Sequence, residues 1–329
     1  MKRALIVGID NYSHPISPLQ GCVNDAIAIN NTLETNGDGA PNFSTKLLTS
    51  NESSITTAVL SDAIESLFAN DADTVLFFFA GHGALDMTTG SLVSQDGYKG
   101  SWGIPLSKIL TLANKASSGI KSTVIILDCC HAGFIGEISE IGNAQVKHVG
   151  SGVTILASCH RDGTASEING HGLFTSIVLD ALNGSSANIC GQITPASVYS
   201  HVDQTLGAWE QRPIYIANVQ TFVTLRQVFP KIPFEVLRRL PEYFPDPASI
   251  FSLNPSFESD RENVPAKYKN IPVNNDNARV FKELQLCNRH GLVVPVDAEH
   301  MYYAAIQSTG CKLTALGAHY RKLAAIKRI

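Results

Sequence analysis

The amino-acid sequence predicts an α/β fold in which helices flank a mostly parallel sheet, followed by a small, mainly helical C-terminal domain. Short apolar runs indicate the strands, helical patterns lie between them, and the composition changes after about residue 225. The runs are apolar at consecutive positions, which is typical of strands that helices bury on both faces. They are RALIVGID (3–10), TVLFFFAGHG (74–83), TVIILDCCHAG (123–133), GVTILASC (152–159) and IYIANV (214–219).

The segments between these runs carry apolar residues at helical spacing. Alternation of strand and helix favours a doubly wound α/β sheet over an all-β or all-α architecture. We expect helices over Asn24–Glu34, Ser54–Ala69, Leu106–Lys115 and Phe174–Asn183.

The chain divides into three parts by composition. A first domain covers residues 1–225, and eight prolines between 230 and 275 indicate a linker or an irregular packed arm over 226–275, because proline interrupts long regular elements. Residues 276–329 return to helical patterns and weakly resemble a winged helix-turn-helix module. They hold an excess of Lys and Arg over Asp and Glu. This favours docking of a recruiting or activating protein at least as much as binding of nucleic acid.

Overall composition excludes several classes of protein. Of the 329 residues, 44% are hydrophobic and 16% charged, which predicts a folded chain with a substantial core. The net charge of −4 provides no general attraction to nucleic acid or to a membrane surface. The apolar runs are too short for a signal-peptide core or for the roughly 18 residues that span a bilayer, so we expect a cytoplasmic protein.

Cysteine usage gives no indication of a metal site. The seven cysteines form no CxxC pair, whereas a zinc site needs clustered ligands at short spacing. In a reducing compartment they are expected to be free thiols, most of them small buried side chains. We therefore expect no cofactor.

Two of the predicted strands end in residues that can perform chemistry. Residues 74–79 lead into His82, and residues 123–127 lead into Cys130. If these strands are parallel neighbours, the imidazole and the thiol emerge at the same edge of the sheet, as a Cys–His pair requires. The backbone N–H groups of Gly83 and Cys130 would then serve as oxyanion-hole donors, so acyl transfer is the expected reaction class.

These segments resemble the caspase and metacaspase family of cysteine peptidases. AGHG (80–83) and DCCHAG (128–133) are similar to its two catalytic signatures, and the 48 residues between His82 and Cys130 fit its spacing. RALIVGIDNY, LQGCVNDA (19–26) and ASCHRDGTASEINGHGLFT (157–175) are also similar to the family. The resemblance covers roughly residues 1–225 and implies a caspase–haemoglobinase-like fold. Ala132 departs from it, because the family usually has Ser there.

The resemblance also implies roles for individual residues. The family places its nucleophile third in the second signature, which is Cys130, and strand alternation then predicts that Cys129 is buried. In metacaspases, the residues that correspond to Asp25 and Asp128 line the S1 pocket. Two carboxylates there would hold a guanidinium or an ammonium group, which predicts cleavage after Arg or Lys. Alternatively, Asp25 is a helix N-cap and Asp128 holds a loop.

Several polar residues near these segments have ordinary interpretations. His171 is expected to be a polar loop residue. Asp96 could belong to a calcium site, since some metacaspases need calcium, but no DxDxDG loop is present. Lys147 lies between the two halves of the domain and is either a self-cleavage site or an ordinary loop lysine.

Two hypotheses of function follow. The first is a thiol endopeptidase that acts on protein or peptide substrates with a basic P1 residue, as an effector switched on by a partner, by analogy in bacterial defence. The second is a catalytically silent caspase-fold scaffold or adaptor. The presence of both His82 and Cys130 favours the first.

Overall fold

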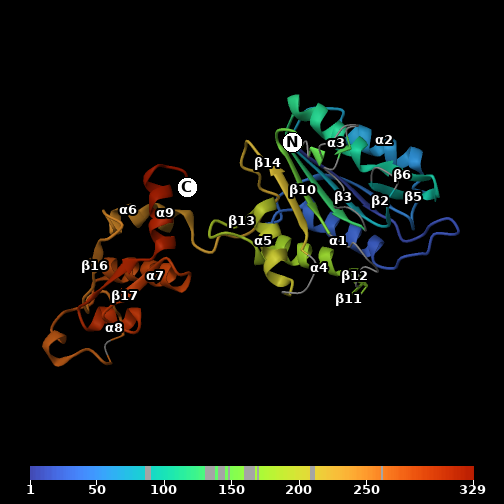
Figure 1. Cartoon of the computed structure of the whole chain (residues 1–329). Helices are drawn as coiled ribbons and strands as arrows, with labels where there is room; N and C mark the ends of the chain where they lie inside the picture. Colours follow the sequence, from blue (N-terminus) through green and yellow to red (C-terminus); the bar gives the residue numbers. More distant parts are fainter. Residues whose placement is uncertain are drawn as a thin grey trace. The chain divides into compact units, whose positions relative to one another are not determined.

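The computed structural model describes residues 1–85, 90–129, 149–158, 170–207, 212–260 and 262–329. It also gives the backbone of three short strands, β8 (Ile138–Ser139), β9 (Gln145–Val146) and β11 (Glu167–Ile168). The chain forms two compact units (Figure 1). The first comprises residues 1–187 and 191–229, and the second comprises residues 188–190 and 230–329.

A six-stranded sheet forms the centre of the first unit. The strand order is β14-β10-β7-β3-β1-β2, and only the edge strand β14 runs antiparallel to its neighbour. This confirms the expected α/β fold with a mostly parallel sheet. The strands are β1 (Lys2–Gly8), β2 (Ser44–Thr49), β3 (Ala72–Ala80), β7 (Ile120–Asp128), β10 (Val153–Ala157) and β14 (Ile214–Asn218).

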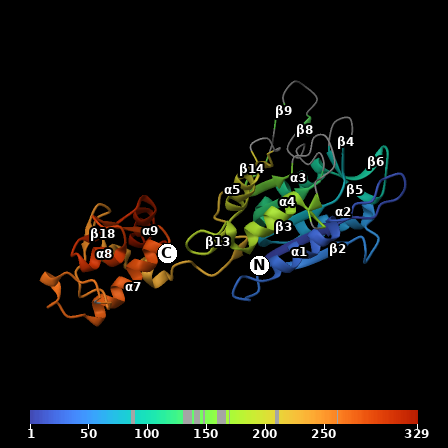
Figure 2. The same ribbon diagram turned by 90° about the horizontal axis from the view of Figure 1, so that it is seen from below.

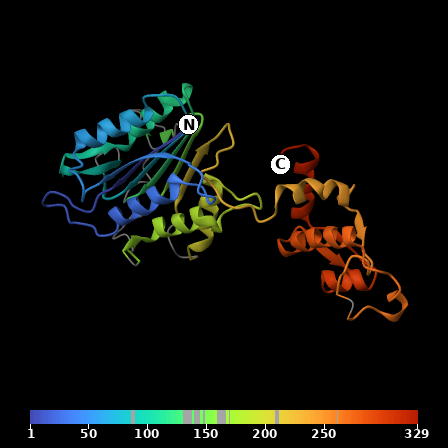
Figure 3. The ribbon, with the colours of Figure 1, turned by 180° about the vertical axis from the view of Figure 1, so that it is seen from behind.

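Helices cover both faces of this sheet, which explains the continuous apolar runs. Successive residues of β3 point to opposite faces: Phe77 and Phe79 join one hydrophobic cluster and Phe78 joins the other, and all three are fully buried. α2 (Thr57–Phe68) and α3 (Leu106–Lys115) pack on one face. α1 (Cys22–Glu34), α4 (Leu173–Asp180) and α5 (Pro195–Thr205) pack on the other (Figure 3).

Several elements were not expected from the sequence. β2 lies at the sheet edge with much of its STKLLT sequence partly exposed, so it lacks a continuous apolar run. A separate antiparallel sheet follows β3 and consists of β4 (Gly83–Leu85), β5 (Gly90–Tyr98) and β6 (Ser101–Pro105). The shorter elements are η1 (Ala116–Ser118), β12 (His171–Gly172), the π-helical η3 (Ala181–Ser185), β13 (Gln192–Ile193) and β15 (Arg226–Gln227).

Helix α1 is capped by a residue from outside the helix. Its N-cap residue, Gly21, has no side chain with which to accept the first N–H groups. Asp10, which follows β1, accepts instead: its Oδ1 lies 2.9 Å from the N–H nitrogen of Cys22 and its Oδ2 3.3 Å from that of Val23. A carboxylate at this position also complements the helix dipole. Asp10 therefore fixes the first turn of α1 against the end of β1.

Replacing Asp10 by Ala should lower the free energy of unfolding by about 1–2 kcal/mol, because two N–H groups at the start of α1 lose their acceptor. Urea denaturation of the full chain measures this. Asp62→Ala is the matched control, since Asp62 is an aspartate of α2 outside the hydrophobic core, and it should change stability by less than about 0.5 kcal/mol. Equal stabilities of the two variants would contradict the capping role.

The second unit has its own hydrophobic core. A three-stranded antiparallel sheet of order β16-β18-β17 packs with α-helices (Figure 2). Buried residues come both from the proline-rich stretch, as with Leu237 and Phe244, and from residues after 276, as with Phe281 and Val293. The stretch before residue 276 is thus part of one folded unit with the residues that follow. The elements are α6 (Phe234–Tyr243), β16 (Ile250–Ser252), η4 (Ala266–Tyr268), α7 (Asn275–Arg289), β17 (Val293–Val296), α8 (Met301–Ile306), β18 (Gly310–Leu313) and α9 (Ala315–Ala325).

Among the described residues, no helix combines the length and the apolar character needed to cross a lipid bilayer.

Candidate functional site

The two strands that precede the expected catalytic residues are adjacent. β3 and β7 pair in parallel, with Ala80 opposite Asp128, and the N–H of Gly81 donates to the carbonyl oxygen of Asp128 across 3.2 Å. This confirms the expectation that the two strands are parallel neighbours. His82 and Cys129, the residue after Asp128, therefore leave the sheet at the same edge. Cys130 itself lies outside the described residues, as does Lys147.

His82 is held by three contacts, two with Tyr12 and one with Ser17. Its backbone N–H donates to Tyr12 Oη (2.8 Å), and its ring lies 4.8 Å, centroid to centroid, from the Tyr12 ring at an angle of 52°. The Nε2 atom of His82 lies 2.8 Å from the carbonyl oxygen of Ser17. Because a carbonyl oxygen only accepts hydrogen bonds, this contact places the proton on Nε2 of the neutral ring and leaves Nδ1 as the basic nitrogen.

The sequence did not indicate Tyr12 or Ser17 as partners of His82. They precede His82 by 70 and 65 residues, and neither stands in a pattern that signals such a contact. Gly81 explains how the Tyr12 side chain comes so close. A Cβ at residue 81 would lie 2.7 Å from Tyr12 Oη and 2.9 Å from Phe79 Cζ, so a larger residue there would displace the phenol from the N–H of His82.

The residues next to the expected catalytic pair are placed as follows. Cys129 is 4% exposed within the hydrophobic cluster of the first unit, which confirms that it is buried. Gly83 begins β4 and stands opposite Leu92 of β5, directly after His82. Its backbone is therefore at the same edge of the sheet as the imidazole.

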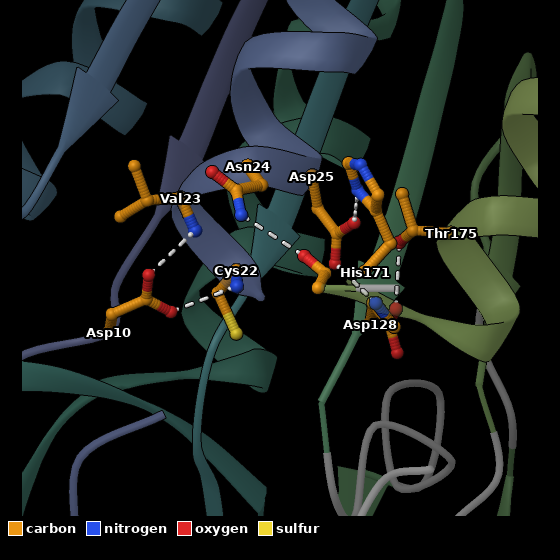
Figure 4. Close-up of polar contacts among 10 residues, drawn as sticks. Asp10, Cys22, Val23, Asn24, Asp25, Asp128, His171 and Thr175 are labelled. Atoms are coloured by element: carbon orange, nitrogen blue, oxygen red, sulfur yellow. Dashed lines mark hydrogen bonds and ion pairs between the residues drawn. The ribbon is translucent and has the colours of Figure 1, made fainter. Parts of the chain in front are cut away.

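Asp25 belongs to the first turn of α1 and is almost fully buried, at 1% exposure. The interpretation of Asp25 as the helix N-cap is wrong, because Gly21 has that position and Asp10 supplies the capping oxygens. The Asp25 carboxylate faces β12 instead. Its Oδ1 lies 2.7 Å from His171 Nδ1, and its Oδ2 accepts the N–H of Gly172 across 3.0 Å (Figure 4).

Asp128, the last residue of β7, approaches the Asp25 carboxylate from the end of the sheet. It is 9% exposed, and its Oδ2 accepts the hydroxyl of Thr175 in α4 across 2.7 Å. Gly172 lies between the two carboxylates. A Cβ at residue 172 would be 2.7 Å from Asp128 Oδ2 and 3.2 Å from Asp25 Oδ2. The structure thus brings together two buried carboxylates that are about 100 residues apart in sequence (Figure 4).

The surroundings of Asp25 disfavour its ionised form. Burial raises the pKa of Asp25 to about 6, against the opposing effects of the hydrogen bonds from Gly172 and His171. The negative charge of Asp128 raises this pKa further. Like charges in a buried site disfavour each other, and a cation held close to the pair would stabilise both ionised forms. The pair therefore favours a positively charged group nearby.

The interpretation of His171 as an ordinary loop residue is wrong. Its side chain is 34% exposed, and its ring pairs with Asp25, which precedes it by 146 residues. Asn24 adds a further contact between α1 and this segment, because its Nδ2 donates to the carbonyl oxygen of Gly170 across 3.1 Å. No sequence pattern near residue 171 signals the contact with α1.

The sequence suggested Asp96 as a possible calcium ligand. In the structure its carboxylate accepts hydrogen bonds near the start of α2. Its Oδ1 accepts the N–H of Thr57 (2.8 Å), the hydroxyl of Thr57 (3.0 Å) and the hydroxyl of Ser94 (2.6 Å). Within the part of the chain that the structure describes, no three His, Cys, Asp or Glu side chains are grouped as metal ligands would be.

Comparison with known proteins identifies the family of the first unit. Residues 1–223 match the family model described as the caspase domain. Two solved structures share the fold: protein GSU0716 from Geobacter sulfurreducens and caspase-1 from Spodoptera frugiperda. The first has a TM-score of 0.50 at 14% identity, over 70% of this chain and 97% of that one. The second has a TM-score of 0.50 at 12% identity, over 69% and 90% of the two chains. No curated protein matched the sequence.

Proposed function

The chain belongs to the caspase domain family, whose members are cysteine peptidases, and we propose that it is an endopeptidase that cleaves after Arg or Lys. The observation that supports this specificity best is the buried pair of carboxylates, Asp25 and Asp128, on either side of Gly172. Asp128 ends β7, beside the strand that leads into His82, and Asp25 belongs to the first turn of α1. A basic P1 side chain at the pair would bring the carbonyl group of the P1 residue toward the reacting residues.

The proposed reaction is acyl transfer in two halves. His82 Nδ1 removes the proton of the Cys130 thiol, and the thiolate sulfur attacks the carbonyl carbon of the basic residue. The N–H groups of Gly83 and Cys130 stabilise the resulting oxyanion. His82 gives its proton to the leaving amine as the C–N bond breaks, which leaves a thioester on Cys130. Water, deprotonated by His82, then hydrolyses the thioester and restores the thiol.

The contacts of His82 support its role as the base. The Ser17 carbonyl fixes the Nε2–H tautomer, and Tyr12 holds the backbone of His82, so Nδ1 remains to accept a proton. A base that is already in the correct tautomer needs no reorganisation before it acts. The chemistry uses protein groups alone and no cofactor.

The second unit is the proposed docking site for a recruiting or activating protein. It has a core of its own and an excess of Lys and Arg after residue 276. A separately folded module with an excess of basic residues can bind an acidic partner protein. Nucleic acid is the other acidic ligand that these residues could attract. We place the enzyme in the cytoplasm, as an effector whose basal activity a partner increases.

A panel of reporter peptides that differ only at P1 tests the proposed specificity. The full chain should hydrolyse Arg and Lys reporters and leave an Asp reporter uncleaved, because a third carboxylate at the pair would be repelled. An arginyl chloromethylketone should alkylate Cys130, which peptide mapping by mass spectrometry would locate. A chain that neither hydrolyses the panel nor reacts with the ketone would instead be a silent scaffold.

A further inference from the structure

One segment gives Asp25 both of its described hydrogen-bond donors. His171 and Gly172 are consecutive residues of β12, and each donates to a different oxygen of the Asp25 carboxylate, across 2.7 Å and 3.0 Å. The hydrogen bond from Asn24 to Gly170 holds the preceding turn on α1. β12 and the residue before it are thus fastened to the first turn of α1 by three bonds, two of which end on one buried carboxylate.

The groups that face Asp25 determine whether its protonated or its ionised form is favoured. Asp128 faces it from the end of β7 and disfavours the ionised form, as does burial. His171 faces it from β12 and favours the ionised form, both as a donor and through the charge it carries when protonated. Thr175 of α4 binds Asp128 and carries no charge. His171 is therefore the one titratable group among these that acts in favour of the carboxylate.

We propose that His171 is a specificity-determining residue of the site: its Nδ1–H keeps Asp25 ionised beside Asp128, so that the pocket presents two negative charges to a basic side chain near neutral pH. This inference rests on the proposed function. His171 acts through Asp25 and does not take part in the chemical step. Its Nδ1 must bear the proton for this role, because an ionised carboxylate only accepts.

The pH dependence follows from the same geometry. As the pH falls through about 6, the Asp25 carboxylate takes up a proton, and the pocket loses one negative charge. Affinity for a cationic side chain should therefore be high above this pH and should weaken below it. Without the His171 donor, Asp25 should become protonated at a higher pH, because one of the effects that lower its pKa is lost.

Binding of a small probe tests the role of His171 without turnover. Each variant is made in the full chain that carries Cys130→Ala, and calorimetry measures its affinity for Nα-acetyl-arginine amide between pH 5 and 8. Nα-acetyl-citrulline amide, which has nearly the same shape and no charge, is the control ligand. We expect His171→Leu to weaken binding of the arginine amide at pH 6 by about five- to tenfold, since one pKa unit is a tenfold change in ionisation. Citrulline amide should be unaffected.

Two further variants test whether the effect comes from loss of the Nδ1–H donor or from a change in the fold. Asn at residue 171 can place an amide N–H near the position of Nδ1, so His171→Asn should restore much of the affinity. His201→Leu removes a histidine that also pairs with an aspartate at 2.7 Å, in this case Asp180, and should leave binding unchanged. Carbon-13 NMR of labelled aspartate, assigned with Asp25→Asn, should show the Asp25 midpoint moving to higher pH in His171→Leu.

The outcomes distinguish the inference from the proposed function. An Asp25 midpoint and an arginine-amide affinity that are the same in His171→Leu and in the Cys130→Ala chain would overturn the role of His171 and leave the pocket intact. No binding of the arginine amide at any pH would overturn the cation pocket itself. If His171→Leu does not fold, nitrogen-15 NMR of the Cys130→Ala chain decides: a His171 ring whose Nδ1 lacks a proton at pH 7.5 would overturn the inference.

Discussion

Replacing His82 by Ala should lower kcat/KM for an Arg reporter peptide by about 10²–10⁴-fold, because the thiol and the leaving amine both lose their proton carrier. The loss should fall on kcat, since His82 is not expected to bind the P1 side chain. Cys130→Ala should reduce hydrolysis at least as far. Initial rates over a range of peptide concentrations measure both constants.

Controls make this result specific to the Cys–His pair. The double variant of His82 and Cys130 should be no slower than Cys130→Ala, because two residues that act as one unit do not contribute additively. His319→Ala removes a histidine of the second unit that lies outside its buried core, and it should keep the wild-type kcat on a short reporter. Hydrolysis by His82→Ala at more than about a tenth of the wild-type rate would rule out His82 as the general base.

Replacing Asp128 by Asn should raise KM for Arg and Lys reporters by about 30-fold or more, which corresponds to ~2 kcal/mol, the lower end of the cost of removing one partner of a buried charge pair. The amide has nearly the shape of the carboxylate and still offers an oxygen to the Thr175 hydroxyl. The fold should therefore persist, and kcat should change less than KM. Steady-state kinetics with Arg and citrulline reporters measure the effect.

The ratio of the two reporters is the sharper measurement. In Asp128→Asn the preference for arginine over citrulline should fall by the same factor as the rise in KM. The reason is that the substitution removes the negative charge that attracts the guanidinium and keeps the shape of the side chain. Asp62→Asn, at a position of α2 outside the hydrophobic core, should leave the ratio unchanged. An unchanged preference in Asp128→Asn would show that the specificity lies elsewhere in the molecule.

Prediction of the strands succeeded where the sequence carries a continuous apolar run. Phe77, Phe78 and Phe79 form an uninterrupted apolar run because helices cover both faces of β3, and such a run can be read locally. β2 could not be recognised in the same way because it lies at the sheet edge, where its STKLLT sequence needs no continuous apolar run. Proline-rich residues before 276 suggested a linker or arm, yet Leu237 and Phe244 are fully buried in the core of the second unit.

The sequence alone determined which residues stand at the ends of the buried strands, because apolar runs and the residues that terminate them are local patterns. It therefore predicted the α/β sheet, and it placed His82 and Asp128 at the ends of two strands that prove to be parallel neighbours. Only the tertiary structure decided that Tyr12 and Ser17 hold His82. It also decided that His171 binds Asp25 and that Gly172 separates the two carboxylates. These contacts join residues that lie 44 to 147 positions apart and depend on the packing of whole elements, so no stretch of sequence records them.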